Sequence, residues 1–177
     1  MNNTKKIIFA VVFVVIAGFL YRFDFVENEV EIDDNLRSQA TVDIYFLNKT
    51  KFARGTEPYE EKVVRSLVTV VGTDLYGYVM LRLFDGPTSA EAENGLAVEY
   101  SGATGATVSI DVITGLARVD LVGGCDSKGA SYTIANLINK NLLQFPEVKV
   151  VHIYDPSGST ETPEDITSNS IPSCLEP

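Results

Sequence analysis

The hydrophobic pattern opens with an uninterrupted apolar run, Ile7 to Tyr21, which follows Lys5 and Lys6. An uncharged run of this kind directs a chain to a membrane. If Arg22 extends toward the lipid headgroups, a helix over 7–25 rises about 28 Å and spans a thin bilayer. We therefore predict an uncleaved membrane anchor over 7–25, and a cleaved signal peptide is the alternative.

Charges on either side of the apolar run predict its orientation. Lysines precede it, whereas the following stretch, 26–40, is acidic and has Arg37 as its sole cation. Positive flanks stay in the cytoplasm. Residues 1–6 are therefore expected inside and the rest of the chain outside, in a single-pass protein of the cytoplasmic membrane. The acidic stretch has no sustained helical or strand period and is interpreted as a solvated stalk.

Four segments beyond the stalk are predicted to be strands. The first is Thr41 to Leu47, in which apolar and polar residues alternate. The segments 108–112 and 117–121 alternate in the same way on either side of Thr114-Gly115, which predicts a β-hairpin. The last strand is expected over 148–154.

Three segments show helical spacing of their apolar residues. The first is expected to begin at Pro58, a residue that suits the first helical position. Its apolar stripe comprises Val63, Val64, Leu67, Val68 and Val71. The second helix begins at a cap in Thr73-Asp74 and ends before Gly86-Pro87. The third runs from Ile134 to Phe145 and ends at Pro146.

The order of these elements along the chain is β, α, α, β, β, α, β. Such an order predicts an α+β fold in which helices pack on one face of a small sheet of about four strands. Residues 88–105, between the second helix and the hairpin, are interpreted as an irregular connection with room for one short strand. The folded domain is thus expected over 41–158, followed by a polar C-terminal tail, 159–177.

Four segments, in this order and at these separations, resemble the GerMN domain of bacterial sporulation and spore germination proteins. They are Val42–Leu47 near the start of the domain, Leu81–Thr88 at the end of a helix, Leu116–Leu121 in the hairpin and Leu143–Val148 before the last strand. The resemblance covers 41–158 and rests on the combination of the four motifs.

The GerMN resemblance implies a non-catalytic α/β module of membrane-tethered or lipid-anchored envelope proteins. Such modules are related in shape to the ring-building motifs of secretion-type assemblies and act through protein contacts, so no catalytic residue carries over. The sequence departs from the family at Val122–Cys125, where members often have a serine soon after the strand's Asp. Since nothing in the sequence indicates a spore-forming source, the envelope role is expected to carry over rather than the germination role.

Composition supports one folded, acidic domain. The chain has 177 residues, of which 45% are apolar, and its 14 Lys and Arg face 24 Asp and Glu, a net charge of −10. A chain of this length forms a single core. Its negative charge repels nucleic acid and anionic lipid. We therefore exclude nucleic-acid binding and expect membrane contact through the N-terminal segment.

Cys125 and Cys174 are the only cysteines and lie 49 positions apart. In a chain exported from the reducing cytoplasm, two cysteines favour a disulfide, here one that holds the tail on the domain. Two free thiols are the alternative. Neither cysteine belongs to a C-x-x-C pair, which argues against a redox enzyme.

Candidate catalytic and metal-binding residues are few. His152 is the only histidine, and one imidazole does not make a usual zinc site, so a structural role is expected. A hydrolase of cell-wall polymer would need paired carboxylates. The acidic candidates for it are Glu91, Glu93, Glu99, Asp111 and Asp120. Alternation in the hairpin places Asp111 and Asp120 opposite the apolar face, which favours solvated surface over catalysis.

The sequence therefore predicts an exported, membrane-tethered interaction module of the cell envelope without catalytic activity, metal or cofactor. Its expected partners are envelope proteins or further copies of the chain, bound through a sheet edge or a helix face. A wall-polymer hydrolase is the alternative function, and a small-ligand sensor with an apolar pocket is a third.

Overall fold

A computed structural model of the chain describes residues 38–69 and 74–177. These residues belong to one compact unit, Arg37–Pro177. The predicted cytoplasmic N-terminus, the predicted anchor at 7–25 and most of the predicted stalk lie outside the described residues. Within them, no helix is long and apolar enough to cross a bilayer.

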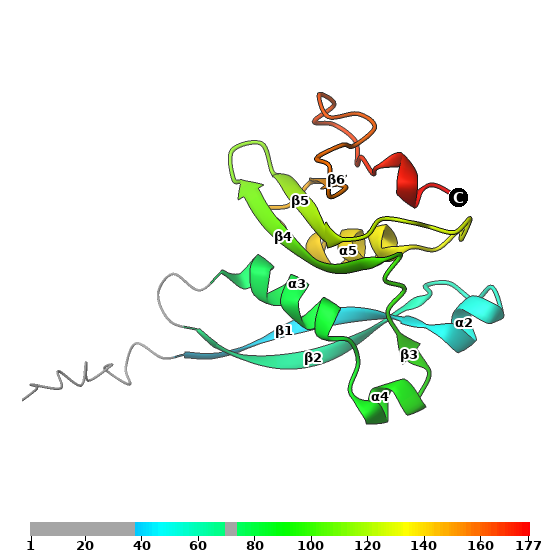
Figure 1. Cartoon of the computed structure of the whole chain (residues 1–177). Coiled ribbons are helices and arrows are strands. Elements are labelled where there is room, and N and C mark those ends of the chain that lie inside the picture. Colours follow the sequence, from blue (N-terminus) through cyan, green and yellow to red (C-terminus); the bar gives the residue numbers. More distant parts are fainter. Residues whose placement is uncertain (1–37, 70–73) are drawn as a thin grey trace, which may run out of the picture. The chain divides into compact units, whose positions relative to one another are not determined.

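The first of two sheets has three antiparallel strands in the order β2-β1-β3 (Figure 1). They are β1 (Ser38–Asn48), β2 (Glu60–Thr69) and the short β3 (Leu96–Ala97). In β1, Val42, Ile44 and other alternate residues are buried, as expected for a sheet with one face on a core. The last residues of the predicted stalk, 38–40, thus belong to a strand.

The second sheet has the order β4-β5-β6. Strands β4 (Ala103–Asp111) and β5 (Leu116–Gly123) form the hairpin predicted from alternation, and β6 (Val150–Tyr154) lies parallel to β5. A parallel neighbour requires a crossover, and helix α5 (Ile134–Leu142) provides it. The hairpin, this helix and the last strand are confirmed.

Short helices fill the remaining connections. The predicted second helix is confirmed as α3 (Leu75–Asp85), with Asp74 as its N-cap. Residues 88–105, expected to be irregular, include α4 (Ser89–Glu93) before β3. Helix α2 (Lys49–Ala53) directly follows β1, and the 3₁₀ helix η2 (Ser173–Leu175) lies near the C-terminus.

The core lies where the two sheets meet α3 and α5. Helix α3 contacts β1 and β4, one strand from each sheet, and also packs against α5 (Figure 1). Helix α5 in turn contacts β1 and β6. The fully buried side chains at this junction include Ile44, Phe46, Val79, Leu83, Ile138, Leu142, Val119 and Ile153. The α+β class is confirmed, but the strands form two three-stranded sheets rather than one sheet of four.

The predicted helix that begins at Pro58 is wrong, because this segment is strand β2. Its residues pair with β1 in an unbroken antiparallel register, for example Ile44 with Val63 and Asp43 with Val64. Valines three, four and seven positions apart suit a helix, but adjacent β-branched residues are stiff and favour a strand. Pairing with β1 therefore determined the structure here.

The C-terminal residues 159–177 are not a loose tail. Ser170 forms a parallel bridge with His152 of β6, and both residues are buried. Leu175 is buried and belongs to the hydrophobic core. The segment thus bonds along the outer edge of β6, whose five residues are all buried. The expected polar tail is therefore part of the folded domain.

A buried side-chain amide links α5 to β1. Asn141 Oδ1 accepts a hydrogen bond from Tyr45 N at 2.9 Å, and its Nδ2 donates to Tyr45 O at 2.9 Å. Nδ2 also donates to Leu137 O within the helix. One turn further, Gln144 Nε2 donates to Asp43 O at 3.0 Å. Both amides thus bond to backbone groups of β1 that no strand pairs.

Substitution of Asn141 by alanine should lower the free energy of unfolding by about 2–4 kcal/mol. The change leaves the N–H and C=O of Tyr45 without partners at a part-buried position. Chemical denaturation followed by circular dichroism measures the loss. Asn94→Ala, which removes an exposed amide from α4, is the control and should change the free energy much less. Equal losses in both variants would contradict the assigned role of Asn141.

Candidate functional site: the free edge of strand β2

Strand β2 has one unpaired edge. Within the described residues it pairs only with β1. Asn48 N donates to Tyr59 O at 2.8 Å, which identifies Asn48 and Tyr59 as a hydrogen-bonded pair of the two strands. In an antiparallel pair the bonded residues alternate, so the N–H and C=O groups of Val63 point to β1. Those of Lys62 and Val64 point outward and form the free edge.

Side chains leave this edge open. Val64 is 57% exposed. Lysines often shield sheet edges, but Lys62 Nζ lies 2.9 Å from Asp43 Oδ2 on the neighbouring strand β1. The Lys62 side chain therefore lies across the sheet instead of beyond its edge.

Helix α3 limits the free edge at one end. The hydroxyl of Tyr78 donates to Ser66 O at 2.9 Å, so this outward carbonyl already has a partner. The stretch available to an added strand thus centres on Lys62–Val64.

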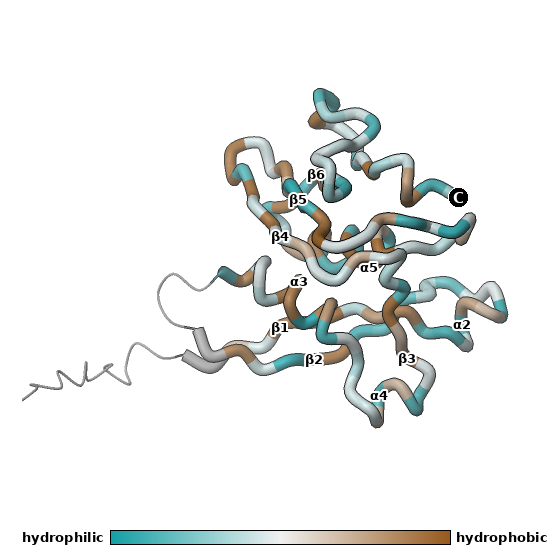
Figure 2. The backbone as a smooth tube through the Cα atoms, in the orientation of Figure 1, coloured by the Kyte–Doolittle hydropathy of each residue, from teal (hydrophilic) through white to brown (hydrophobic). Residues whose placement is uncertain are grey.

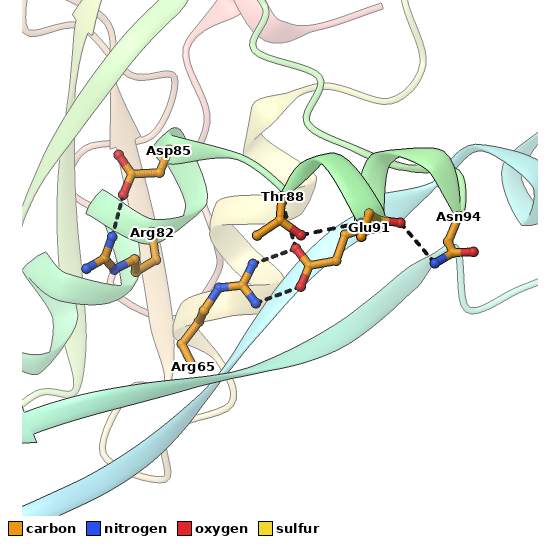
Figure 3. A network of polar contacts seen from close by, with 7 residues as sticks. Arg65, Arg82, Asp85, Thr88, Glu91 and Asn94 are labelled. Atoms are coloured by element: carbon orange, nitrogen blue, oxygen red, sulfur yellow. Dashed lines mark hydrogen bonds and ion pairs between the residues drawn. The ribbon is translucent and has the colours of Figure 1, made fainter.

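An ion pair holds α4 beside β2. Arg65 Nη1 and Nη2 donate to the two carboxylate oxygens of Glu91 at 2.7 and 2.6 Å (Figure 3). Glu91 also accepts from Thr88 N at 2.8 Å, and Glu91 N donates to Thr88 Oγ1, which completes the capping box of α4. The Arg65 guanidinium, followed by the Thr88 amide, lowers the pKa of Glu91 to about 2. Glu91 therefore has a structural role.

The stabilising effect of Glu91 should depend on pH. Its pKa is lowered in the folded state, so the stabilisation is complete above the ordinary value of 4.5 and is lost as the pH falls toward 2. We expect the free energy of unfolding of the wild type to exceed that of Glu91→Gln by about 2 kcal/mol at pH 7. Denaturation series between pH 7 and 2 measure this difference. The exposed Glu93→Gln serves as the control, and a difference for Glu91→Gln that does not shrink in acid would contradict the ion-pair assignment.

The two hairpin carboxylates do not form a catalytic pair. The register pairs Asp111 with Leu116 and Asp120 with Thr107. Both carboxylates lie on the face opposite the buried residues, as predicted. They are four residues apart along the hairpin, about 13 Å, which exceeds the spacing of paired carboxylates in glycosidases. Asp120 bonds to Arg118 at 2.6 Å, and Asp111 accepts from Ile113 N at 2.9 Å.

The remaining acidic candidates, Glu93 and Glu99, are exposed. Glu91 belongs to a helix beside the first sheet, whereas Asp111 and Asp120 belong to the second. The structure therefore does not gather the five predicted carboxylates into one cleft. In the part of the chain that the structure describes, no three His, Cys, Asp or Glu side chains form a group able to hold a metal ion.

His152 holds the C-terminal segment on β6. Its ring is fully buried, and Nε2 lies 2.8 Å from Asp165 O and 3.2 Å from Ser168 O. Because both neighbours are carbonyl oxygens, Nε2 carries the proton and donates it. Nδ1 is buried without a hydrogen-bond partner among the described residues. This arrangement agrees with the predicted structural role.

A disulfide joins Cys125 and Cys174, with their Cα atoms 5.6 Å apart. Backbone bonds surround it: Ser127 N donates to Cys174 O at 2.8 Å, and Ser127 Oγ donates to Glu176 O at 2.6 Å. The C-terminal segment is thus fixed to the chain that follows β5.

Loss of this disulfide should lower the free energy of unfolding by about 4 kcal/mol, since it closes a loop of 49 residues. Denaturation of Cys125→Ser/Cys174→Ser against wild type measures the loss. Thiol labelling of the unreduced wild-type protein, followed by mass spectrometry, should add no label. Two labels before reduction would show that the bond does not form in the cell.

The groove between β1 and α5 is not the apolar pocket that a small-ligand sensor requires. A groove of about 400 Å³ lies between β1 and α5. Its lining is mostly polar: Tyr45, Glu60, Asn136, Asn139, Lys140, Leu143 and Gln144. Small-molecule sites are predominantly apolar, so this groove does not support the sensor hypothesis.

The free edge did not follow from the sequence, because the apolar spacing predicted a helix over these residues. The strand signal was present, since Val63, Arg65 and Leu67 face the sheet interior in alternation with the exposed Val64 and Ser66. A period of two and a period of 3.6 both fit so short a segment.

Comparisons with known proteins do not show the family of this chain. No protein-family model matches the sequence, and no curated protein matches it either. Among solved structures, the chain is similar to the tandem GerMN domains of the sporulation protein GerM from Bacillus subtilis. The two are 20% identical, with a TM-score of 0.43, over 72% of this chain and 42% of that one. The chain thus spans less than half of that structure, and membership of the GerMN family stays a prediction.

Proposed function

We propose that this chain is a membrane-tethered, extracytoplasmic interaction module without catalytic activity. It binds an envelope protein, or another copy of itself, by adding a strand to the free edge of β2. The observation that carries this proposal is the pair of unpaired backbone positions at Lys62 and Val64, beside an apolar side chain that is 57% exposed. Added strands gain main-chain hydrogen bonds at such edges and specificity from alternate side chains.

Two features support the extracytoplasmic location. The apolar run and its preceding lysines predict export of the following domain. The Cys125–Cys174 disulfide suits an oxidising compartment outside the cytoplasm.

The positions of the acidic residues support a role without catalysis. Glu91 is bound to Arg65 and Asp120 to Arg118, and Asp111 accepts hydrogen bonds from its own turn. Paired acid and base groups across a cleft are what a wall-polymer hydrolase would require.

The short length of the edge favours a tethered mode of action. An added strand over Lys62–Val64 gains few hydrogen bonds, so the contact is weak between freely diffusing molecules. Two partners held on one membrane meet at a high effective concentration, which compensates for a small interface.

Val64→Pro should abolish partner binding while the fold persists. Proline is tolerated on an edge strand where its nitrogen faces solvent, and the Val64 N–H is not used by the β1 ladder. A photocrosslinking residue in place of Lys62 in the cellular protein should give an adduct of defined mass. Val64→Pro should reduce that adduct roughly tenfold.

Val64→Thr is the matched control, since it keeps both the N–H and β-branching and should retain the adduct. A photocrosslinker in place of Ile166, an exposed residue of the C-terminal segment, reports random contacts. An adduct that survives Val64→Pro, or that forms equally at position 166, would contradict the edge as the binding site.

A further inference from the structure

The β4–β5 hairpin ends in two exposed aliphatic side chains. Val112 is 76% exposed and Ile113 is 91% exposed, more than any other large apolar side chain that the structure describes. Figure 2 shows the apolar colour at the outer end of this hairpin. Adjacent apolar residues at a projecting point mark a contact surface. We call Val112 and Ile113 the hairpin tip.

The turn holds the hairpin tip outward. Asp111 Oδ1 accepts from Ile113 N at 2.9 Å, and Asp111 O accepts from Gly115 N at 2.7 Å. Gly115 has φ of +78°, and a Cβ there would lie 2.9 Å from Glu147 O. The turn therefore requires glycine and fits closely against the chain before β6. The two aliphatic side chains are the exposed apolar feature of this turn.

Oppositely charged side chains, Asp111 and Lys149, lie beside the hairpin tip. The Asp111 carboxylate is turned toward the amide of Ile113, which lowers its pKa. The Lys149 side chain lies beside Gly115, because a Cβ on this glycine would approach Lys149 Cγ to 3.0 Å. A lysine next to an inserted apolar residue can remain at the level of lipid headgroups.

The hairpin tip lies at the same end of the domain as the start of β1. Lys149 N donates to Gly115 O at 2.8 Å, and Glu147 accepts from the hydroxyl of Tyr76, at the beginning of α3. Helix α3 follows β2, whose last residue pairs with Ser38. Figure 1 shows the start of β1, the start of α3 and the tip of the hairpin on the same side.

We propose that the hairpin tip inserts into the lipid bilayer that holds the N-terminal segment. This inference rests on the proposed membrane tether. Twelve residues, 26–37, separate the predicted anchor from Ser38, and a chain of that length reaches at most about 40 Å. The end of the domain that holds the start of β1 is therefore limited to about that distance from the membrane.

The tether also explains why two side chains suffice. Two aliphatic residues bind a bilayer too weakly to hold a free protein there. Attached to the same membrane, the hairpin tip inserts as an intramolecular step. The net charge of −10 gives no electrostatic attraction to anionic lipid, so insertion depends on the apolar contact.

The absence of tryptophan from the sequence makes insertion directly measurable. The full chain carrying Ile113→Trp is reconstituted into phosphatidylcholine vesicles with brominated acyl chains, which quench tryptophan on contact. We expect roughly twofold or greater quenching relative to vesicles without bromine, because interfacial tryptophan lies beside the acyl chains. Ile166→Trp, at a site that is 53% exposed, should show no quenching. Adding Val112→Asp to Ile113→Trp should remove the quenching.

The outcomes separate the two proposals. A chain that fails to float with the vesicles overturns the membrane tether and the insertion together. A chain that floats but shows equal emission with both lipids overturns insertion alone. The tryptophan emission of Ile113→Trp could instead shift to the blue as more protein is added per vesicle, without quenching by bromine. That result assigns the hairpin tip to contact between copies and also overturns insertion.

Discussion

The fold depends on the hydrogen-bond partners of the backbone groups on both sides of β1. β2 pairs with one side along the whole strand, whereas β3 reaches only its last two residues on the other. The amides of Asn141 and Gln144 bond to the remaining groups at Tyr45 and Asp43. A buried backbone group without a partner is costly. These side chains therefore allow β1 to lie inside the core and attach the first sheet to the helix that crosses the second.

The arrangement around β1 also determines which strand edge remains free to pair with a further strand. Because α5 and β3 use one side of β1, the free edge of the first sheet belongs to β2. In the second sheet, residues around Ser170 bond to the outer edge of β6, and α3 packs against β4. Among the described residues, the edge at Lys62–Val64 lacks a partner strand, and the hairpin tip is exposed.

Local patterns predicted much of the fold, and non-local pairing decided the rest. The hairpin was predictable because alternation and a Thr-Gly turn agree over the same residues, and α5 because its apolar stripe is strong. The β2 segment was not, because its valines fit both periods and only pairing with β1 decides between them. The Asn141 link joins residues 96 positions apart, and no spacing rule indicates it. The candidate edge was missed for the same reason, whereas the cysteine pair followed from the predicted compartment.

The position of the disulfide has a consequence for the order of assembly. Cys125 is synthesised 49 residues before Cys174, and α5 and β6 lie between them. The disulfide can therefore form only after the residues of α5 and β6 have been synthesised. Oxidation is a late step of assembly, and the bond closes a loop that contains the whole crossover.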